Sequence, residues 1–189
     1  MSLFAVKPTL HGASIILRPF TASDINMMGA ILADPQMLRL TGSVHSTTET
    51  QEQSPHLDAV TTEWYETRAD QQDRLDLAIV DRSTDDCVGE VVLNKVDLAN
   101  DACSFRILIG AAGRNRGLGS EATRLVLDHA FATTRLNRIA LEVYAFNPRA
   151  LHVYERAGFQ SEGRLRAALK FDGAYIDAIV MSVLREDRA

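Results

Sequence analysis

A glycine-rich segment at residues 113–125, GRNRGLGSEATRL, has the residue types of an anion-binding turn. It follows the apolar run FRILIG (105–110) and precedes a helical pattern. Such a turn places several backbone N–H groups at the positive end of a helix, and its glycines remove side chains that would block a close approach. Arg114 and Arg116 add positive charge. These residues predict a site for a phosphate or a pyrophosphate.

Several ligands have to be weighed for this turn. A nucleoside triphosphate loop needs a lysine next to Ser or Thr after its last glycine, whereas Gly119 is followed by Ser120 and Glu121. The letters GLGSEA also match a dinucleotide fingerprint, with Glu142 as its ribose ligand. However, only about 45 residues follow Glu142, too few for the remaining units of a dinucleotide-binding domain. A turn without any ligand is the other alternative.

A second segment, LEVYAFNPRALHVYERAGF (141–159), has groups suited to acid–base chemistry. Strand alternation puts Glu142 on the face opposite Leu141 and Val143. A carboxylate is costly to bury unless it is paired, so we expect Glu142 to open onto a cleft. Tyr154 lies in the helical pattern that follows. A salt-bridged structural Glu142 and a Tyr154 ring packed on the sheet are the alternatives.

The elements that must position these groups follow from periodicity and turn signals. We predict strands at about 13–20, 75–81, 87–97, 103–110, 138–147, 159–171 and 174–184, and helices at about 21–34, 57–69, 118–133 and 148–158. Pro35 ends the first helix in this interpretation, and Asn147 caps the last one. The fold class is α+β, in three α/β/α layers, with a mixed and mostly antiparallel sheet of about seven strands and about four helices. Residues 1–189 form a single domain.

Two motifs together resemble one family. Arg114-x-x-Gly117-x-Gly119 matches the R/Q-x-x-G-x-G/A signature of the GNAT superfamily of acetyl-CoA-dependent N-acetyltransferases. The strand, asparagine and helix of 141–159, ending in Y-E-x-x-G-F, look like the second signature of that superfamily. Residues 163–187 are similar to the ending of the group that includes ribosomal-protein N-terminal and spermidine acetyltransferases.

The resemblance implies roles for individual residues. Tyr154 would be the general acid that protonates the departing thiolate, and Glu142 the candidate general base, with Glu90 as the alternative. A main-chain N–H at a bulge near Ile109 would stabilise the oxyanion. The pyrophosphate of acetyl-CoA would be bound by the turn and the cap residue, namely Arg114, Asn115, Arg116, Gly117, Leu118, Gly119, Ser120 and Asn147.

The resemblance also places the acceptor, a primary amine, beside residues of about 41–74. This region has eight acids between Glu49 and Asp76 against Arg68 and Arg74. The acids suit a cationic amine, but a solvated acidic helix is the preferred interpretation. Trp64 and Asp177 are the further acceptor-side candidates. A protein N-terminus and a small cationic amine both remain open as acceptors.

The composition of the chain argues against several other kinds of partner, site and location. The formal net charge of -5 argues against nucleic acid or an anionic membrane as a partner. The two cysteines form no CxxC pair, and we expect no metal site, no disulfide, no secretion signal and a cytoplasmic location. A homodimer through the edge of the terminal hairpin is possible. A non-catalytic acyl-CoA sensor and an NAD-binding oxidoreductase are the rival functions.

Overall fold

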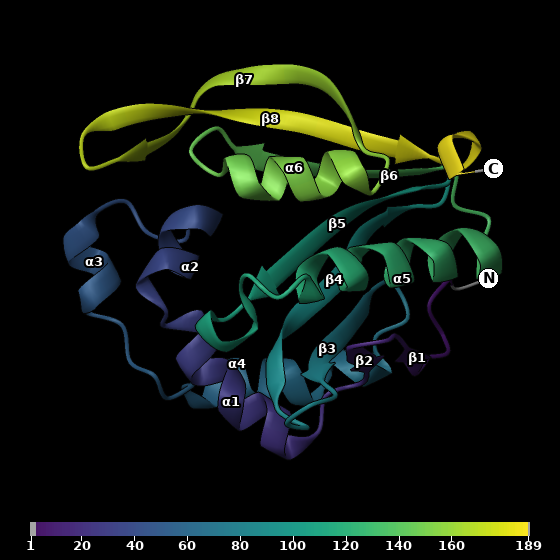
Figure 1. The fold of residues 1–189 in the computed structure, drawn as a ribbon, viewed down its shortest axis with the longest axis horizontal. Helices are drawn as coiled ribbons and strands as arrows, with labels where there is room; N and C mark the ends of the chain where they lie inside the picture. The colour runs from purple at the N-terminus through teal and green to yellow at the C-terminus, as the bar shows by residue number, and fades with distance from the viewer. Residues whose placement is uncertain (1–2, 189) are drawn as a thin grey trace.

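An eight-stranded mixed sheet forms the centre of the molecule in the computed structural model, which describes residues 3–188 (Figure 1). The strands lie in the order β1-β2-β3-β4-β5-β6-β8-β7. Their bounds are β1 Leu10–His11, β2 Ile15–Arg18, β3 Leu75–Asp81, β4 Cys87–Asp97, β5 Ala102–Ile109, β6 Arg138–Tyr144, β7 Gln160–Phe171 and β8 Ala174–Leu184.

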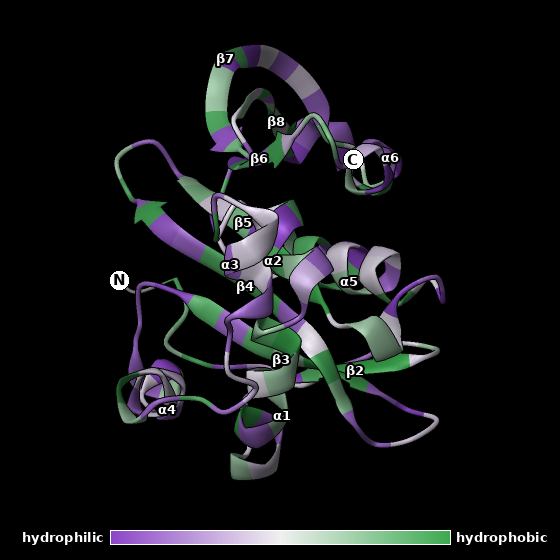
Figure 2. Cartoon of the chain, turned by 90° about the vertical axis from the view of Figure 1, so that its left-hand side faces the viewer, coloured by the Kyte–Doolittle hydropathy of each residue, from purple (hydrophilic) through white to green (hydrophobic). Residues whose placement is uncertain are grey.

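Helices cover both faces of this sheet. They are α1 Ala22–Leu32, α2 Pro35–Thr41, α3 Thr47–Gln51, α4 Ala59–Glu66, α5 Leu118–Thr133 and α6 Pro148–Arg156, with short 3₁₀ turns at Arg68–Asp70, Ala111–Gly113 and Arg185–Arg188. In β3, Leu77 and Ile79 belong to the core beneath α5, whereas Ala78 and Val80 belong to the core beneath α1 and α4. The two helical layers therefore lie on opposite faces, as Figure 2 shows.

The sheet opens between β5 and β6. These two strands are parallel and pair only from Ala102 to Ser104 with Arg138 to Ala140. Beyond Ser104 the strands diverge, so that β6, β8 and β7 form a separate arm above β1 to β5 (Figure 1). The main-chain groups of β5 that would pair with β6 past this point are left facing the gap.

A bridge joins the two arms on the side of α2 and α3. Leu38 and Val44 pack against Leu169 and Phe171 of the β7–β8 hairpin. The backbone N–H and the hydroxyl of Thr47 both donate to the Asp172 carboxylate, at 2.8 and 2.6 Å. The segment around α2 and α3 is thus held against the tip of the hairpin.

The fold class predicted from the sequence is confirmed, with more elements than expected. The structure has eight strands and six α-helices within residues 3–188, because β1, α2 and α3 were not predicted. The first helix ends before Pro35, as predicted, but Pro35 also begins a helix that was not predicted. Asp34 caps a new helix by accepting from Met37 N at 2.7 Å, and Pro35 takes its first position, where a missing N–H costs nothing.

None of the helices in the described part of the chain is both long and apolar enough to cross a lipid bilayer.

Candidate active site

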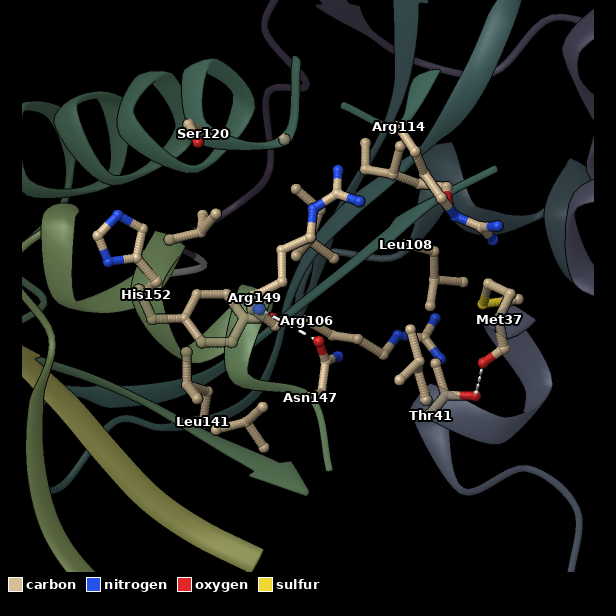
Figure 3. Close-up of a pocket in the computed structure, with 18 of the residues that line it drawn as sticks. Met37, Thr41, Arg106, Leu108, Arg114, Ser120, Leu141, Asn147, Arg149 and His152 are labelled. Atoms are coloured by element: carbon tan, nitrogen blue, oxygen red, sulfur yellow. Dashed lines mark hydrogen bonds between the residues drawn. The ribbon is translucent and has the colours of Figure 1, made fainter. Parts of the chain in front are cut away.

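A cavity of about 660 Å³ lies where β5 and β6 diverge (Figure 3). Its walls come from α2, the β5 strand, the glycine turn, the start of α5, the β6 strand and α6. Met37 and Thr41 of α2 lie on the opposite side of the cavity from Ser120 and His152 in this view (Figure 3). The divergence of the strands therefore brings both signature segments to one opening.

The start of α5 offers unpaired donors to this cavity. Gly117 is the N-cap residue, with φ of 79°, and no side chain caps the helix. The N–H groups of Leu118, Gly119 and Ser120 have no partner within the helix because they belong to its first turn. All four residues line the cavity. Free N–H groups at the positive end of a 16-residue helix are an arrangement that favours an anion.

The two arginines of the turn have different surroundings. Arg114 lines the cavity, but its guanidinium pairs with Asp34 at 2.6 Å and donates to the Ile109 carbonyl at 3.1 Å. It therefore ties the turn to the cap of α2. Arg116 does not line the cavity, and its guanidinium pairs with Asp81. This ion pair lowers the pKa of Asp81 to about 2.

Two side chains of α6 were missed by the sequence interpretation. Arg149 and His152 line the cavity, and Figure 3 shows the Arg149 side chain extending into it. Arg149 has no hydrogen bond or ion pair to any residue between 3 and 188, so its charge is free to meet a ligand. Its position two residues after Asn147, in the first turn of α6, is the signal that could have revealed it.

Asn147 has the structural role that the sequence predicts. Its Oδ1 accepts from Ala150 N at 3.1 Å and so caps α6. Asn147 also lines the cavity, together with Asn115, whose φ of 61° lies in the left-handed region. Both amides can therefore reach a ligand, and the cap alone accounts for Asn147.

Tyr154 lies at the cavity with its ring packed in the core. The ring makes edge contacts with Phe105 and Phe159, at centroid distances of 5.9 and 5.8 Å. Burial raises the pKa of Tyr154 to about 12. Its hydroxyl makes no hydrogen bond to the described residues. The ring packs as the predicted alternative has it, and the residue also lines the cavity, so the role of Tyr154 as the acid stays a prediction.

The main chain of Ile109 faces the gap between the arms. Gly110 N donates to Val88 O at 2.8 Å, and alternate residues of an antiparallel strand point their N–H groups in opposite directions. The N–H of Ile109 consequently points away from β4. The predicted bulge at Ile109 is wrong, because the β4–β5 register runs unbroken from Gly89 to Asn94. The free N–H results from the separation of β5 and β6.

The two candidate bases differ sharply in exposure. Glu142 is exposed, lines the cavity and has no ion pair within residues 3–188. Glu90 is fully buried, accepts from Tyr65 Oη at 3.0 Å and pairs with Arg106 at 2.6 Å. Burial raises the pKa of Glu90, and Arg106 opposes that shift. Glu142 is thus the carboxylate that a ligand in the large cavity can reach.

The acceptor-side candidates are not brought together. Trp64 lines a second cavity of about 280 Å³, with Glu90 and Arg106 at its floor, and Arg68 lies 3.5 Å from the centre of the indole ring. Asp177 lines neither cavity. Its Oδ1 accepts from Ala167 N at 2.8 Å, which fixes the irregular pairing of β7 with β8 between Leu165 and Leu169.

The acids of the 41–74 region also lie elsewhere. None of the eight acidic side chains between Glu49 and Asp76 lines either cavity. Asp58 caps α4, and Asp76 is paired with Arg74 at 2.5 Å. Within residues 3–188 no group of three or more His, Cys, Asp or Glu side chains is placed to hold a metal ion.

Comparison with known proteins places this geometry in a family. Residues 14–160 match the family described as an acetyltransferase (GNAT) domain. The chain belongs to the GNAT acetyltransferase family. The resemblance inferred from the two motifs is thereby confirmed.

Relatives of this GNAT chain include named N-acetyltransferases. A spermidine N(1)-acetyltransferase of Vibrio cholerae is 29% identical over 57% of this chain, and the match spans 62% of the relative. The probable N-acetyltransferase YjcK of Bacillus subtilis is 31% identical over 65% of this chain and 68% of its own length. A crystal structure of the Vibrio cholerae spermidine N-acetyltransferase, in complex with CoA and spermine, has the same fold. It has a TM-score of 0.78 and 21% identity, over 93% of this chain and 98% of that one.

Proposed function

We propose that this protein transfers the acetyl group of acetyl-CoA to a primary amine, by direct attack of the amine on the thioester. The observation that carries the proposal is that an uncapped helix start, an unpaired tyrosine hydroxyl and an exposed glutamate line one cavity. The family match supports the reaction class, and the CoA bound to the Vibrio cholerae enzyme supports the cosubstrate.

Binding of the cosubstrate rests on charge as well as on the helix start. Three arginines line the large cavity, Arg106, Arg114 and Arg149, against one acid, Glu142. Arg106 and Arg114 are already paired with Glu90 and Asp34, so the unpaired positive charge that favours a pyrophosphate is that of Arg149. Arg149 takes the place that the sequence assigned to Arg116, because its guanidinium is free and faces the cavity (Figure 3). Arg114 then acts mainly by holding the turn against α2.

The proposed reaction transfers two protons and replaces the C–S bond of the thioester with a C–N bond. The neutral amine nitrogen bonds to the thioester carbon while the C–S bond breaks. Glu142 takes the proton lost by the amine, directly or through water, and Tyr154 gives its proton to the departing thiolate. The Ile109 N–H, turned toward the gap, donates to the developing oxyanion. Proton exchange with solvent returns Glu142 and Tyr154 to their starting protonation states. The products are an amide and free coenzyme A.

Glu142 is proposed over Glu90 because of access. Both oxygens of Glu90 already accept hydrogen bonds, from Tyr65 and from Arg106, and the side chain is fully buried. A substrate proton could reach it only after that network broke. Glu90 therefore serves the structure of the second cavity, and Glu142 serves as the base.

The proposal extends to the cellular setting and the assembly of the protein. Cys87 and Cys103 are free and buried, and burial raises the pKa of each thiol to about 12, which suits a reducing cytoplasm. β7 is an outer strand of the sheet and is exposed along most of its length. We propose that this edge pairs with a second copy in a homodimer. The proposal includes no metal, no nucleic acid and no membrane.

Calorimetric titration with acetyl-CoA, coenzyme A and NAD tests the proposal against its rivals. We expect both CoA species to bind and NAD to give no heat above dilution. Binding of NAD alone would establish the oxidoreductase alternative. Binding of acetyl-CoA without release of thiol in the presence of any amine would establish the sensor.

A further inference from the structure

The second cavity, of about 280 Å³, has apolar walls and a charged floor. Leu32 of α1 and Val60 and Trp64 of α4 form its walls, and Glu90 and Arg106 lie at its floor. Val60 is 76% exposed, so this wall of the cavity is open to solvent. An engineered apolar cavity of about 150 Å³ is large enough for benzene. The second cavity can therefore hold an aromatic or a branched aliphatic group.

Arg106 lines both the second cavity and the large one, and its position is here called the junction of the cavities. Its side chain is 46% exposed, and its Nη2 donates to Glu90 at 2.6 Å. The Nε and Nη1 groups have no hydrogen bond to a residue of the described chain, and a guanidinium has five N–H donors. Nη1 and the second N–H of Nη2 can thus offer a forked pair of donors at the junction of the cavities, which is the geometry that binds a carboxylate.

The charges around this junction do not favour a polycation. Both oxygens of Glu90 are engaged, and none of the acids between Glu49 and Asp76 lines either cavity. The charged residues that line the second cavity are Glu90 and Arg106, which are paired with each other. A second ammonium group of an acceptor would meet no free carboxylate here.

We propose that the acceptor is an α-amino acid with an apolar side chain. Its carboxylate binds Arg106 at the junction, its side chain enters the second cavity beside Trp64, and its amine faces the large cavity. The proposal rests on the proposed acetyl transfer and names the substrate class for it. An α-amino acid fits because its amine, carboxylate and side chain leave one carbon in three directions, and the junction offers three matching environments.

The preference for an α-amino acid acceptor can be tested with the wild-type protein. Release of thiol is followed at saturating acetyl-CoA with L-phenylalanine, L-phenylalanine amide and spermidine. We expect kcat/KM for L-phenylalanine to exceed that for each of the other two by at least about tenfold, the value of one charge-assisted hydrogen bond. Equal or better use of the amide would overturn the role of the carboxylate, and better use of spermidine would overturn the substrate class.

Substitution of Arg106 tests the residue itself. Arg106→Gln should lower kcat/KM for L-phenylalanine about ten- to a hundredfold and change that for the amide less than about threefold. Because this variant leaves Glu90 buried without its cation, the double variant Arg106→Gln/Glu90→Gln is measured beside it. Arg124→Gln, an exposed position on α5 outside both cavities, is the matched control. An equal loss for both acceptors would overturn the assignment.

A result that contradicts the inferred acceptor class can be distinguished from one that contradicts the proposed acetyl transfer. If no amine releases thiol although acetyl-CoA binds, the acetyl transfer and the inference that rests on it are both overturned. If amines are acetylated without a preference for the carboxylate, only the inference is overturned. Trp64→Ala gives an independent check, since it should reduce the preference for L-phenylalanine over glycine and leave the affinity for acetyl-CoA unchanged.

Discussion

At the scale of single residues, the environment of each side chain decides its chemistry. Tyr154 and Tyr65 are both buried tyrosines, but the hydroxyl of Tyr65 donates to Glu90, and that of Tyr154 has no partner in residues 3–188. Of these two tyrosines, Tyr154 lines the large cavity and Tyr65 does not. Its hydroxyl is therefore available to a leaving group, whereas that of Tyr65 is committed to the structure.

Replacing Tyr154 with phenylalanine tests its role as the acid. We expect Tyr154→Phe to lower kcat about a hundred- to ten-thousandfold, which is the usual contribution of a positioned proton donor. The affinity for acetyl-CoA should change less than about threefold, because the ring contacts with Phe105 and Phe159 remain. An assay of thiol release measures kcat, and calorimetry measures the affinity for acetyl-CoA. Tyr175→Phe, at an exposed tyrosine outside both cavities, is the matched control, and wild-type turnover by Tyr154→Phe would remove Tyr154 from the mechanism.

The raised pKa of Tyr154 predicts the shape of the pH profile. Burial stabilises the neutral phenol, so its pKa of about 12 keeps the proton in place throughout the alkaline range. The rate should rise as the acceptor amine loses its proton and then stay level up to about pH 10.5. An ordinary tyrosine with a pKa near 10 would lose activity there. A profile of kcat against pH, with folding followed by circular dichroism, distinguishes the two, and a decline centred near pH 9 to 10 contradicts the assignment.

The residue scale also shows why side-chain roles were only partly predictable. The turn, its glycines, Tyr154 and Glu142 were found from local patterns, because each lies within one short motif. The partner of Arg114 lies 80 residues away in the chain, and that of Arg116 lies 35 residues away. No local pattern reveals such pairs, so charge alone could not separate these two arginines from Arg149.

At the scale of elements, the glycine turn and α2 form one unit. Asp34 caps α2 and also pairs with Arg114, whose guanidinium reaches Gln36 at 2.9 Å. These contacts, with desolvation opposing them, hold the pKa of Asp34 below its usual value. The position of the turn therefore depends on a helix that the sequence did not predict, because Pro35 was interpreted only as a stop.

Two substitutions at Asp34 separate its two roles. Asp34→Asn keeps a capping side chain and removes the charge, so we expect a loss of stability below about 1 kcal/mol together with a several-fold rise in KM for acetyl-CoA. Asp34→Ala removes both contacts and should cost about 1–2 kcal/mol. Thermal unfolding and steady-state kinetics measure these effects. Unchanged KM in both variants would show that the Arg114 contact does not position the turn.

At the scale of the whole molecule, the site exists because two arms of the sheet separate and are held apart. Three residue pairs join β5 to β6 at one end, and the Thr47–Asp172 contact joins α3 to the hairpin at the other. The main strands and helices along the chain and the mixed character of the sheet were predicted from periodicity and turns, whereas the spatial order of the strands was not predicted. The divergence of β5 and β6 was not, because it depends on pairing across the sheet and has no local sequence pattern.

The most direct test of the central claim is the release of thiol from acetyl-CoA by the purified protein, with an amine panel and mass spectrometry of the products. The account predicts release that depends on an amine, with one acetyl group on the amine for each thiol formed, and its loss in Tyr154→Phe. Tight binding of acetyl-CoA with no acetylated amine in any reaction would contradict it.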